Sequence, residues 1–394
     1  MAAEKNNKTL NVPNLRFPEF SGEWEKAILL DVCEINPKTP SLDEEFVYID
    51  LESVEKGEIL HENVISRDDA PSRAQRVLKF NDILFQCVRP YQKNNLLFAR
   101  DTHTIQYVAS TGYAQIRTDK QNPAFLYQLL NTQKFIDQVM LRCTGTSYPA
   151  INTNDLSKIA IRYPLQIEEQ NKIAKLLSLL DGRIKTQKKV IEKYESLIRG
   201  ISNKFLYTEN GIPVRLGDIL LERSERTKVN NQHEVLSSTV KGIFSQREYF
   251  SKEIASENNV GYKIIHLHDV VLSPQNLWMG NINYNDKYDI GIVSPSYKIF
   301  SIAEGYDKRF VSALLKTHRA LYNYMLVSEQ GASIVRRNLN MEAFEQLVFK
   351  MPPIDKQREV GDAISALQSR LELAVRVKTA YEKQKQWLLT EMFI

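Results

Sequence analysis

Apolar residues between Gln166 and Leu206 recur with alternating spacings of four and three positions. This heptad-like spacing is typical of a helix that packs along another helix, and polar Gln187 interrupts it once. The series predicts one long helix whose apolar seam needs a partner. Its seam positions are Ile173, Leu177, Leu180, Ile184, Ile191, Tyr194 and Ile198, continued by Ile201 and Phe205.

A second series of the same phase lies near the C-terminus, at an offset of 187 residues from the first. Two helices that match at a fixed offset indicate an internal duplication, and they provide each other's partner within one chain. Two lysines interrupt the second seam, which would weaken a dry interface. The second seam consists of Val360, Ile364, Leu367, Leu371, Ala374, Lys378, Tyr381, Lys385, Leu388 and Met392.

The segment before the first long helix mixes strand and helix patterns. Short apolar stretches bounded by turn residues predict strands at Phe46–Leu51, Asp82–Val88 and Leu156–Tyr163. Asn122–Gln138 predicts a helix, with Asn122 as its N-cap and a proline at its first position. These elements together predict an α+β globule.

The segment between the two long helices repeats these landmarks. Leu29–Val32 corresponds to Leu216–Ile219, and Phe80–Leu84 corresponds to Leu267–Val271, both at the offset of 187. A helix predicted at Phe310–Val327 corresponds to the one at Asn122–Gln138. Two similar frames with divergent sequences between the landmarks suit a protein that recognises two different things.

The predicted fold class is α+β, with two similar α+β globules separated by two long antiparallel coiled-coil helices in a pseudo-two-fold internal repeat. The N-terminal arm carries two prolines and suits an extended, docked segment. The predicted regions are an arm at 1–24, a globule at 25–165, a helix at 166–206, a linker at 207–212, a second globule at 213–350 and a helix at 351–394.

Composition and charge narrow the functional classes. The 394 residues carry a formal net charge of only +4, so a nucleic-acid surface would have to be a local patch. Cys33, Cys87 and Cys143 form no CxxC pair, which favours reduced thiols, no metal site and a cytoplasmic location. The chain has no signal-peptide core and no run of 18 apolar residues, so we expect no membrane insertion.

Catalytic signatures are missing from the sequence. It contains neither a GxxxxGK[ST] phosphate loop nor a GxGxxG turn nor a GxSxG elbow. The string Met351-Pro-Pro-Ile354 lacks the amide or carboxylate of the motif with which adenine methyltransferases bind their target amine. These absences favour a binding protein over an enzyme, and we expect no catalytic residue.

Two pairs of loops at matched places combine cations, amides and aromatic rings. Arginine pairs with guanine, and asparagine or glutamine with adenine, while arginine also binds phosphates. For any single loop, ordinary solvation is the simpler interpretation, but the loops recur in both halves with different residues. The candidate DNA-binding residues are Arg89, Tyr91, Gln92, Lys93, Asn94, Asn95, Thr144, Thr146, Ser147 and Tyr148 in the first half, and Gln275, Asn276, Trp278, Asn281, Ser333, Arg336 and Arg337 in the second.

The order of these features resembles one family. Each long helix follows a proline and carries a glutamine in its first turns, namely Gln170 and Gln357. Leu-Leu-Asp-Val and Leu-Gly-Asp-Ile open the two globules, and Asp-Ile-Leu-Phe and Asp-Val-Val-Leu form their central strands. This globule–helix–globule–helix order resembles the specificity subunit of type I restriction–modification systems. One departure is Lys356, which stands where the first half has Glu169.

The resemblance implies a non-catalytic subunit with two target-recognition domains, each of which reads one half of a bipartite target in double-stranded DNA. It further implies that the helices set the gap between the halves and dock two methyltransferase subunits, which bind S-adenosylmethionine and methylate adenine at N6. Two restriction subunits, which use ATP and Mg, would complete the assembly. No cofactor is expected in this chain itself.

A coiled-coil scaffold whose two globules bind proteins is the alternative. DNA binding that weakens steeply with salt would favour a specificity subunit, whereas salt-insensitive protein binding would favour the scaffold.

Overall fold

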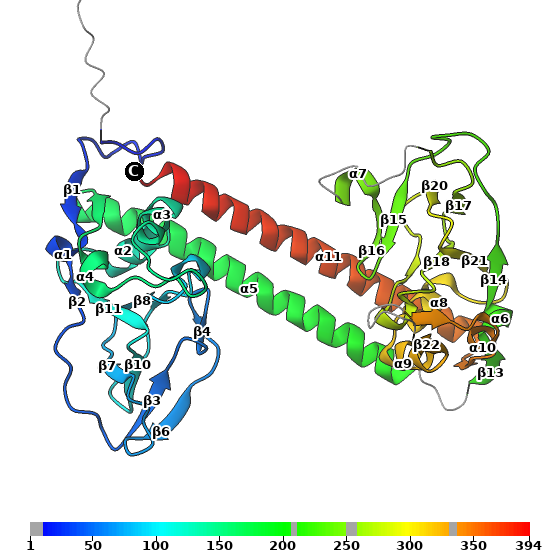
Figure 1. Cartoon of the computed structure of the whole chain (residues 1–394), viewed down its shortest axis with the longest axis horizontal. Helices are drawn as coiled ribbons and strands as arrows, with labels where there is room; N and C mark the ends of the chain where they lie inside the picture. The colour runs from blue at the N-terminus through cyan, green and yellow to red at the C-terminus, as the bar shows by residue number, and fades with distance from the viewer. Residues whose placement is uncertain (1–10, 206–210, 250–257, 331–336) are drawn as a thin grey trace, which may run out of the picture. The chain divides into compact units, whose positions relative to one another are not determined.

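The computed structural model describes residues 11–205, 211–249, 258–330 and 337–394. The chain divides into two compact units, unit 1 (Met1–Lys188 with Arg376–Ile394) and unit 2 (Lys189–Val375). Each unit combines one globule with parts of the two long helices α5 (Ile167–Phe205) and α11 (Ile354–Glu391) (Figure 1). The boundaries between the compact units therefore lie within the helices, whereas the sequence pattern placed its domain boundaries at the helix ends.

Unit 1 contains two four-stranded sheets. The sheet β6-β3-β10-β7 includes the parallel pair β3 and β10, and the sheet β2-β11-β8-β9 is antiparallel throughout. Apart from the long helices, the elements of unit 1 are β1 (Glu25–Ile28), α1 (Leu29–Val32), β2 (Glu34–Ile35), β3 (Glu45–Ile49), β4 (Val54–Glu55), β5 (Glu58–Ile59), β6 (Asn63–Ser66), β7 (Ala74–Val77), β8 (Ile83–Gln86), the 3-10 helix η1 (Pro90–Gln92), β9 (Leu96–Leu97), β10 (Gln106–Ser110), β11 (Tyr113–Arg117), α2 (Pro123–Leu130), α3 (Gln133–Met140), α4 (Thr153–Ser157) and β12 (Ala160–Tyr163).

Unit 2 repeats the antiparallel sheet with the strand order β14-β21-β18-β19. Apart from the long helices, the elements of unit 2 are β13 (Ile212–Arg215), α6 (Leu216–Ile219), β14 (Leu220–Arg223), β15 (Leu236–Thr239), β16 (Gly242–Ser245), α7 (Gln246–Tyr249), β17 (Lys263–His266), β18 (Val270–Leu272), the 3-10 helix η2 (Leu277–Met279), β19 (Ile282–Tyr284), β20 (Ile290–Val293), β21 (Lys298–Ile302), α8 (Lys308–Leu315), α9 (His318–Leu326), β22 (Ser328–Gln330), β23 (Arg337–Leu339), α10 (Met341–Glu345) and β24 (Val348–Met351).

The duplication extends to single turns of the backbone. The short helices α1 and α6, and the 3-10 helices η1 and η2, begin 187 residues apart. The strand pairs β1–β12 and β13–β24 also share a register, because Glu25 pairs with Tyr163 and Ile212 pairs with Met351. The α+β fold and the internal repeat predicted from the sequence are confirmed.

Each predicted mid-globule helix is in fact two helices. A threonine caps the second helix in both units, since Thr132 accepts the N–H of Phe135 at the start of α3, and Thr317 accepts that of Ala320 at the start of α9. A side chain that caps a new helix competes with continuation of the old one. The single strand predicted at Leu156–Tyr163 was also wrong, because its first residues belong to α4 and only Ala160–Tyr163 form β12.

The long helices run antiparallel within each unit. In unit 1, the Lys385 ammonium lies 2.6 Å from an Asp181 carboxylate oxygen, and the Arg183 guanidinium lies 5.7 Å from the Tyr381 ring centre. As the residue number increases along α5, the number of the contacting residue on α11 decreases, as expected for antiparallel helices. Every described seam position is buried or half-buried, and Lys385 is stabilised on the seam by its ion pair rather than by snorkelling.

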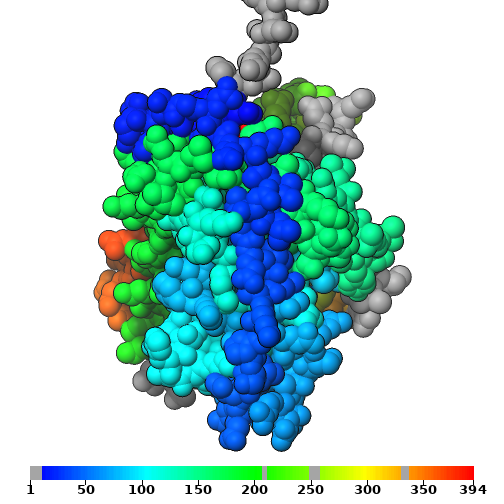
Figure 2. All heavy atoms as spheres, turned by 90° about the vertical axis from the view of Figure 1, so that its left-hand side faces the viewer, coloured from blue at the N-terminus to red at the C-terminus, as the bar shows by residue number. Residues whose placement is uncertain are grey.

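The described part of the arm packs against unit 1. It lies along the top of the face seen in Figure 2, in the darkest blue. The Leu15 N–H donates to the Glu391 carbonyl at 2.9 Å, so the arm contacts the end of α11. Trp24 is buried against Phe125 and Phe393, with ring centres about 6 Å away. Among the described residues, no helix has the length and apolar content to cross a membrane.

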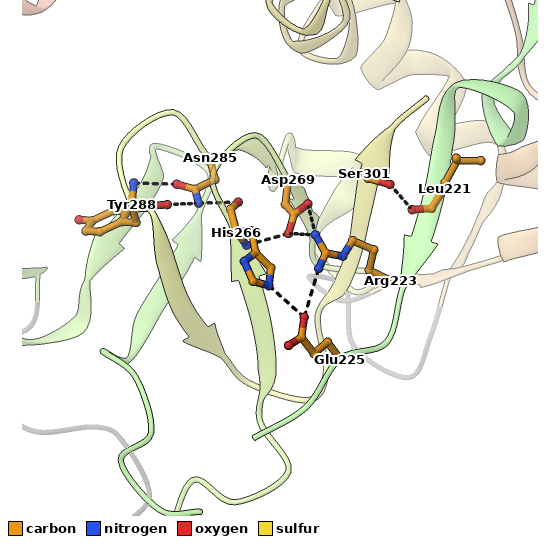
Figure 3. Close-up of polar contacts among 8 residues, drawn as sticks. All are labelled: Leu221, Arg223, Glu225, His266, Asp269, Asn285, Tyr288 and Ser301. Carbon is orange, nitrogen blue, oxygen red and sulfur yellow. Dashed lines mark hydrogen bonds and ion pairs between the residues drawn. The ribbon is translucent and has the colours of Figure 1, made fainter. Parts of the chain in front are cut away.

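A buried aspartate organises the turn before the central strand of each unit. In unit 2, Asp269 accepts the backbone N–H of His266 at 2.7 Å and lies within 3.3 Å of the Arg223 guanidinium (Figure 3). Asp82 of unit 1 binds Lys79 N–H and Arg117 in the same way. Burial raises the pKa of Asp269. This polar cluster is therefore explained by the structure of the turn.

Candidate nucleic-acid interface

The two candidate loops of unit 1 lie side by side. The loop after β8 contacts the loop after α3 through the Arg89 N–H, which donates to the Pro149 carbonyl at 2.8 Å. The second loop is closed by Thr144 and Ala150, whose backbones exchange two hydrogen bonds of 2.9 and 3.0 Å. Residues separated by more than fifty positions in the sequence thus form one surface.

Arg89 and Tyr148 form the centre of this surface. The guanidinium carbon lies 4.3 Å from the Tyr148 ring centre, which is a cation–π geometry. Tyr148 is 63% exposed, and Tyr91 in the first loop is 51% exposed. Thr146 and Ser147 are also exposed beside the ring. An arginine, two aromatic rings and two hydroxyls are therefore available at the surface together.

The remaining polar residues of the first loop hold its shape. Asn95 is 1% exposed, accepts the Gln86 N–H at 2.8 Å and donates to Asn131 at 3.0 Å. Gln92 accepts from the Gln86 amide, and Asn94 accepts from the Lys56 N–H. We therefore remove Asn95 from the proposed contact residues, because its side chain is buried and fully occupied.

Lys93 is bound to the globule as well. Its ammonium donates to the Asn131 carbonyl at 3.3 Å and to Gln133 at 3.0 Å, and burial lowers its pKa. Lys93 has a φ of 55°, in the left-handed region that favours glycine. The matching residue of unit 2 is Gly280, with a φ of 93°. The left-handed residue after the 3-10 helix is therefore a feature of both frames.

Unit 2 brings its two candidate loops together in a similar way. The Arg337 N–H donates to the Gln275 carbonyl at 3.2 Å, and the Arg337 guanidinium lies 4.9 Å from the Trp278 ring centre. Gln275 is exposed, and Asn276 and Trp278 are half-buried. Ser333 and Arg336 lie outside the described residues.

Asn281 is a second candidate that the structure places inside. It is 5% exposed, and its amide bonds with Ser238 at 3.0 and 3.1 Å. Sequence analysis missed the layer beneath the loop, where Asn283 donates to Ser238 and Thr239 and accepts from Lys316. No local motif marks these residues, because they come from β15, from β19 and from the end of α8.

The cysteines and histidines provide no catalytic or metal centre among the described residues. Burial raises the pKa of both Cys33 and Cys87 to about 12, which disfavours a nucleophilic thiolate. No group of three or more metal-binding side chains occurs within the described ranges. His266 faces Glu225 and His268 stacks on Tyr284, so the two histidines do not share a site.

A cavity of about 390 Å³ in unit 1 is lined by several charged side chains that form ion pairs with one another. It lies between the β4–β5 hairpin and the two long helices. Lys185 and Lys188 contact Glu58 at 3.2 and 3.5 Å, and Lys378 contacts Glu382 at 2.7 Å. The two pairs with Glu58 connect the hairpin to α5, whereas Lys378 and Glu382 pair within α11, so these lining residues have a structural role.

One family model and two curated relatives match parts of the chain. Residues 21–195 match the family model described as the type I restriction modification DNA specificity domain. The specificity subunit of the type I restriction enzyme HindI from Haemophilus influenzae is 26% identical over 160 residues, and that of MjaVIII from Methanocaldococcus jannaschii is 28% identical over 199 residues. The matches cover 39% and 48% of this chain, and 34% and 46% of those relatives, so they span between a third and a half of either protein.

Two solved structures share the fold over nearly the whole chain. The type I restriction–modification S subunit from M. genitalium aligns over 97% of this chain and 99% of its own, with 14% identity and a TM-score of 0.64. A chain from a structural study of assembly and conformational transition of the type I R-M system aligns over 94% of this chain and 97% of its own, with 18% identity and a TM-score of 0.52.

The chain shares its two-globule fold with both of these solved chains. The family-model match and both curated relatives are described as type I specificity proteins. The resemblance to type I specificity subunits inferred from the residue pattern is confirmed.

Proposed function

We propose that this chain is the non-catalytic DNA-specificity subunit of a type I restriction–modification complex. Each globule would read one half of a bipartite target in double-stranded DNA. The family match in residues 21–195 and the named relatives support this role. The complex would act in the cytoplasm.

The duplicated loop pair is the observation that carries the proposal. In unit 1, the loop after the central strand contacts the loop after the second mid-globule helix, and in unit 2 the loop after the central strand contacts Arg337 at the start of β23. The frames match at an offset of 187, while the exposed side chains differ. A fixed frame with different base-reading side chains is what recognition of two unlike half-sites requires, since sequence is read by side chains at base edges.

We also propose that α5 and α11 set the gap between the half-sites and dock two methyltransferase subunits. The 39 residues of α5 correspond to about 58 Å of helix at 1.5 Å per residue. One turn of duplex spans about 34–36 Å, so helices of this length suit readers placed roughly one turn apart. S-adenosylmethionine would bind to the methyltransferases, and ATP and Mg would be used by two restriction subunits.

Methylation mapping of DNA from cells with and without this chain, expressed with its methyltransferase partner, tests the central role. We expect adenine methylation in a bipartite motif only when the chain is present. Methylation that does not depend on the chain, or that follows an unsplit motif, would contradict the proposal.

Insertion of four residues after Gly182 tests the spacer role. The insertion lengthens α5 by about 6 Å, or roughly two base-pair steps, and adds a stutter to the seam. We expect a changed gap between unchanged half-sites. Gly182→Ala, which leaves the length of α5 unchanged, is the matched control. An unchanged gap in the insertion variant would refute the spacer role.

A further inference from the structure

We infer that Arg89 and Arg337 each read a guanine, one in each half-site, through a guanidinium held on the face of an aromatic ring. This inference rests on the proposed function and identifies a specificity-determining contact within it. Arg89 carries most of the inference, because both loops of unit 1 lie within the described residues.

The stacked geometry leaves the hydrogen-bonding edge of the guanidinium available. The Arg89 guanidinium carbon lies over the Tyr148 ring, 4.3 Å from its centre, and a guanidinium stacked on a ring in this position presents the edge of its plane to a second ligand. Its N–H donors lie in that plane as a rigid fork that matches O6 and N7 of guanine in the major groove. Within the described ranges, no carboxylate pairs with Arg89 or with Arg337.

The backbone of unit 1 holds this arginine in an unusual conformation. Arg89 has a φ of 56°, which is rare for a residue other than glycine, and its N–H is bonded to Pro149. Gly145 turns the second loop with a φ of 89°, and a Cβ there would approach the Tyr148 carbonyl at 3.0 Å. Strained backbone at an exposed loop is typical of functional positions. A phosphate contact would need only a flexible cation, whereas base-edge reading needs a fixed one.

The two units reach the same arrangement by opposite routes. In unit 1, the first loop supplies the arginine and the second loop supplies the aromatic ring. In unit 2, the first loop supplies the aromatic ring, Trp278, and the arginine is Arg337, at the end of the second candidate loop. The two frames match, but the residues that form the pair have exchanged loops. Folding of the frame does not explain the exchange, whereas a shared need for a stacked arginine does.

Several of the amides that could read bases instead hold the loops in place. Asn95 and Asn281 are buried, and the side chains of Gln92 and Asn94 accept hydrogen bonds within unit 1. Arg89, which is half-buried, remains as the charged planar donor of the first loop. The ligand chemistry it fits is the two-acceptor edge of guanine in double-stranded DNA.

The test measures initial methylation rates of the complete complex, formed by this chain with its methyltransferase. The substrates are the target duplex and variants that differ from it at one base pair. For both Arg89→Ala and Arg89→Lys, we expect discrimination at one G·C pair in one half-site to fall roughly 5- to 150-fold, which corresponds to about 1–3 kcal/mol. Lysine should not restore discrimination, because it keeps the positive charge but lacks the two parallel N–H donors of the guanidinium. Arg337→Lys should reduce discrimination at one G·C pair in the other half-site.

Two further variants separate the ring from its hydroxyl. Tyr148→Phe keeps the stacked ring and should leave discrimination unchanged. Tyr148→Leu removes the cation–π contact and should reduce discrimination at the Arg89 position by roughly 2- to 5-fold. Arg142→Ala is the matched control, because Arg142 is an exposed arginine near the same loop that binds the Gln138 carbonyl instead of a ring.

The outcomes are distinguishable. If Arg89→Ala weakens methylation of all duplexes equally and Arg89→Lys restores it, Arg89 contacts phosphate and the inference is overturned. Unchanged rates and discrimination in Arg89→Ala also overturn it. If discrimination is lost in both half-sites, the variant has disturbed the whole complex, and the Tyr148 pair then decides. If the unsubstituted complex shows no bipartite preference, the proposed function itself fails.

Discussion

The buried ion pair between the arm and α5 allows a quantitative test of what holds the arm in place. Glu169 is fully buried, and its two oxygens accept from Arg16 at 2.8 and 2.7 Å and from the Trp24 indole at 3.2 Å. Arg16→Ala leaves this carboxylate with the indole and the positive end of α5 as its remaining partners. The expected result is a large local destabilisation.

The magnitude follows from the burial. Removal of one partner of a buried pair typically costs about 3–5 kcal/mol, because the other charge remains desolvated. The indole N–H and the helix N-terminus each offset part of that cost, by about 1 kcal/mol or less. We therefore expect Arg16→Ala to destabilise the arm and the first turns of α5 by roughly 2–4 kcal/mol.

The same surface provides the control. Lys172 pairs with Glu19 between α5 and the arm, but both side chains are more than 40% exposed. Lys172→Ala should cost about 0–1 kcal/mol, as exposed pairs do. Hydrogen exchange of peptides covering residues 11–24 and 166–173 measures both effects locally.

A double-mutant cycle of Arg16→Ala and Glu169→Ala decides whether the pair acts as a unit. The double variant should cost at least about 1 kcal/mol less than the sum of the single variants, since residues in contact are not additive. Equal effects of Arg16→Ala and Lys172→Ala, or an additive cycle, would refute this account of how the arm is held.

Three further predictions concern stability and reactivity. Gly182→Ala should stabilise the chain against urea by about 0.5–1 kcal/mol, because no atom lies within 4 Å of the added Cβ; a loss of stability would reveal a contact there. Gly291→Ala should destabilise it by about 1–3 kcal/mol, since the new Cβ would overlap the Leu236 side chain; an unchanged urea midpoint would contradict the packing. Alkylation at pH 8 should label Cys143 before Cys33 and Cys87, because burial raises the pKa of the latter two thiols to about 12; equal labelling rates, measured by mass spectrometry, would argue against burial. For the same reason, the free energy of unfolding should fall as the pH rises above about 9, where the thiols of the unfolded chain ionise while the buried thiols of the folded chain keep their protons.

The long-range pattern of the fold was predictable because it depends on periodicity. A helix that packs on a helix must repeat every three or four residues, so α5 and α11 are visible in the sequence. The duplication was visible because matched elements stand at a constant offset. The breaks between α2 and α3 and between α8 and α9 were missed, because a threonine cap interrupts the helix without interrupting its apolar pattern.

The candidate interface was predictable in composition but not in geometry. The sequence identifies loops that combine cations, amides and aromatic rings, yet it does not show which amides point inward. Asn94 and Asn95 are neighbours of the same type, but Asn95 is fully buried and Asn94 is not. The contact of Arg89 with Tyr148 joins loops far apart in the chain, so no local pattern predicts it.

Two adjacent positions at the start of each long helix differ in how far they match between the units: the glutamines Gln170 and Gln357 match, whereas Glu169 and Lys356 do not. Gln170 accepts the Asn122 N–H at 2.9 Å and donates to the Pro164 carbonyl, and Gln357 makes the same contacts with Asp307 and Pro352. Both glutamines are buried, because each joins its helix to the start of a mid-globule helix, which both units need.

The position before this glutamine differs between the two helices, because Arg16, the partner of Glu169, belongs to the arm of unit 1. Glu169 binds Arg16 of the arm, whereas the matching Lys356 lies over the Phe205 ring and pairs with Glu359. A carboxylate at 356 with no arginine to bind it would be a buried charge without a partner if it were enclosed as Glu169 is. Lys356, which departs from the repeat, thus suits a helix start that lacks the partner that Arg16 provides to Glu169.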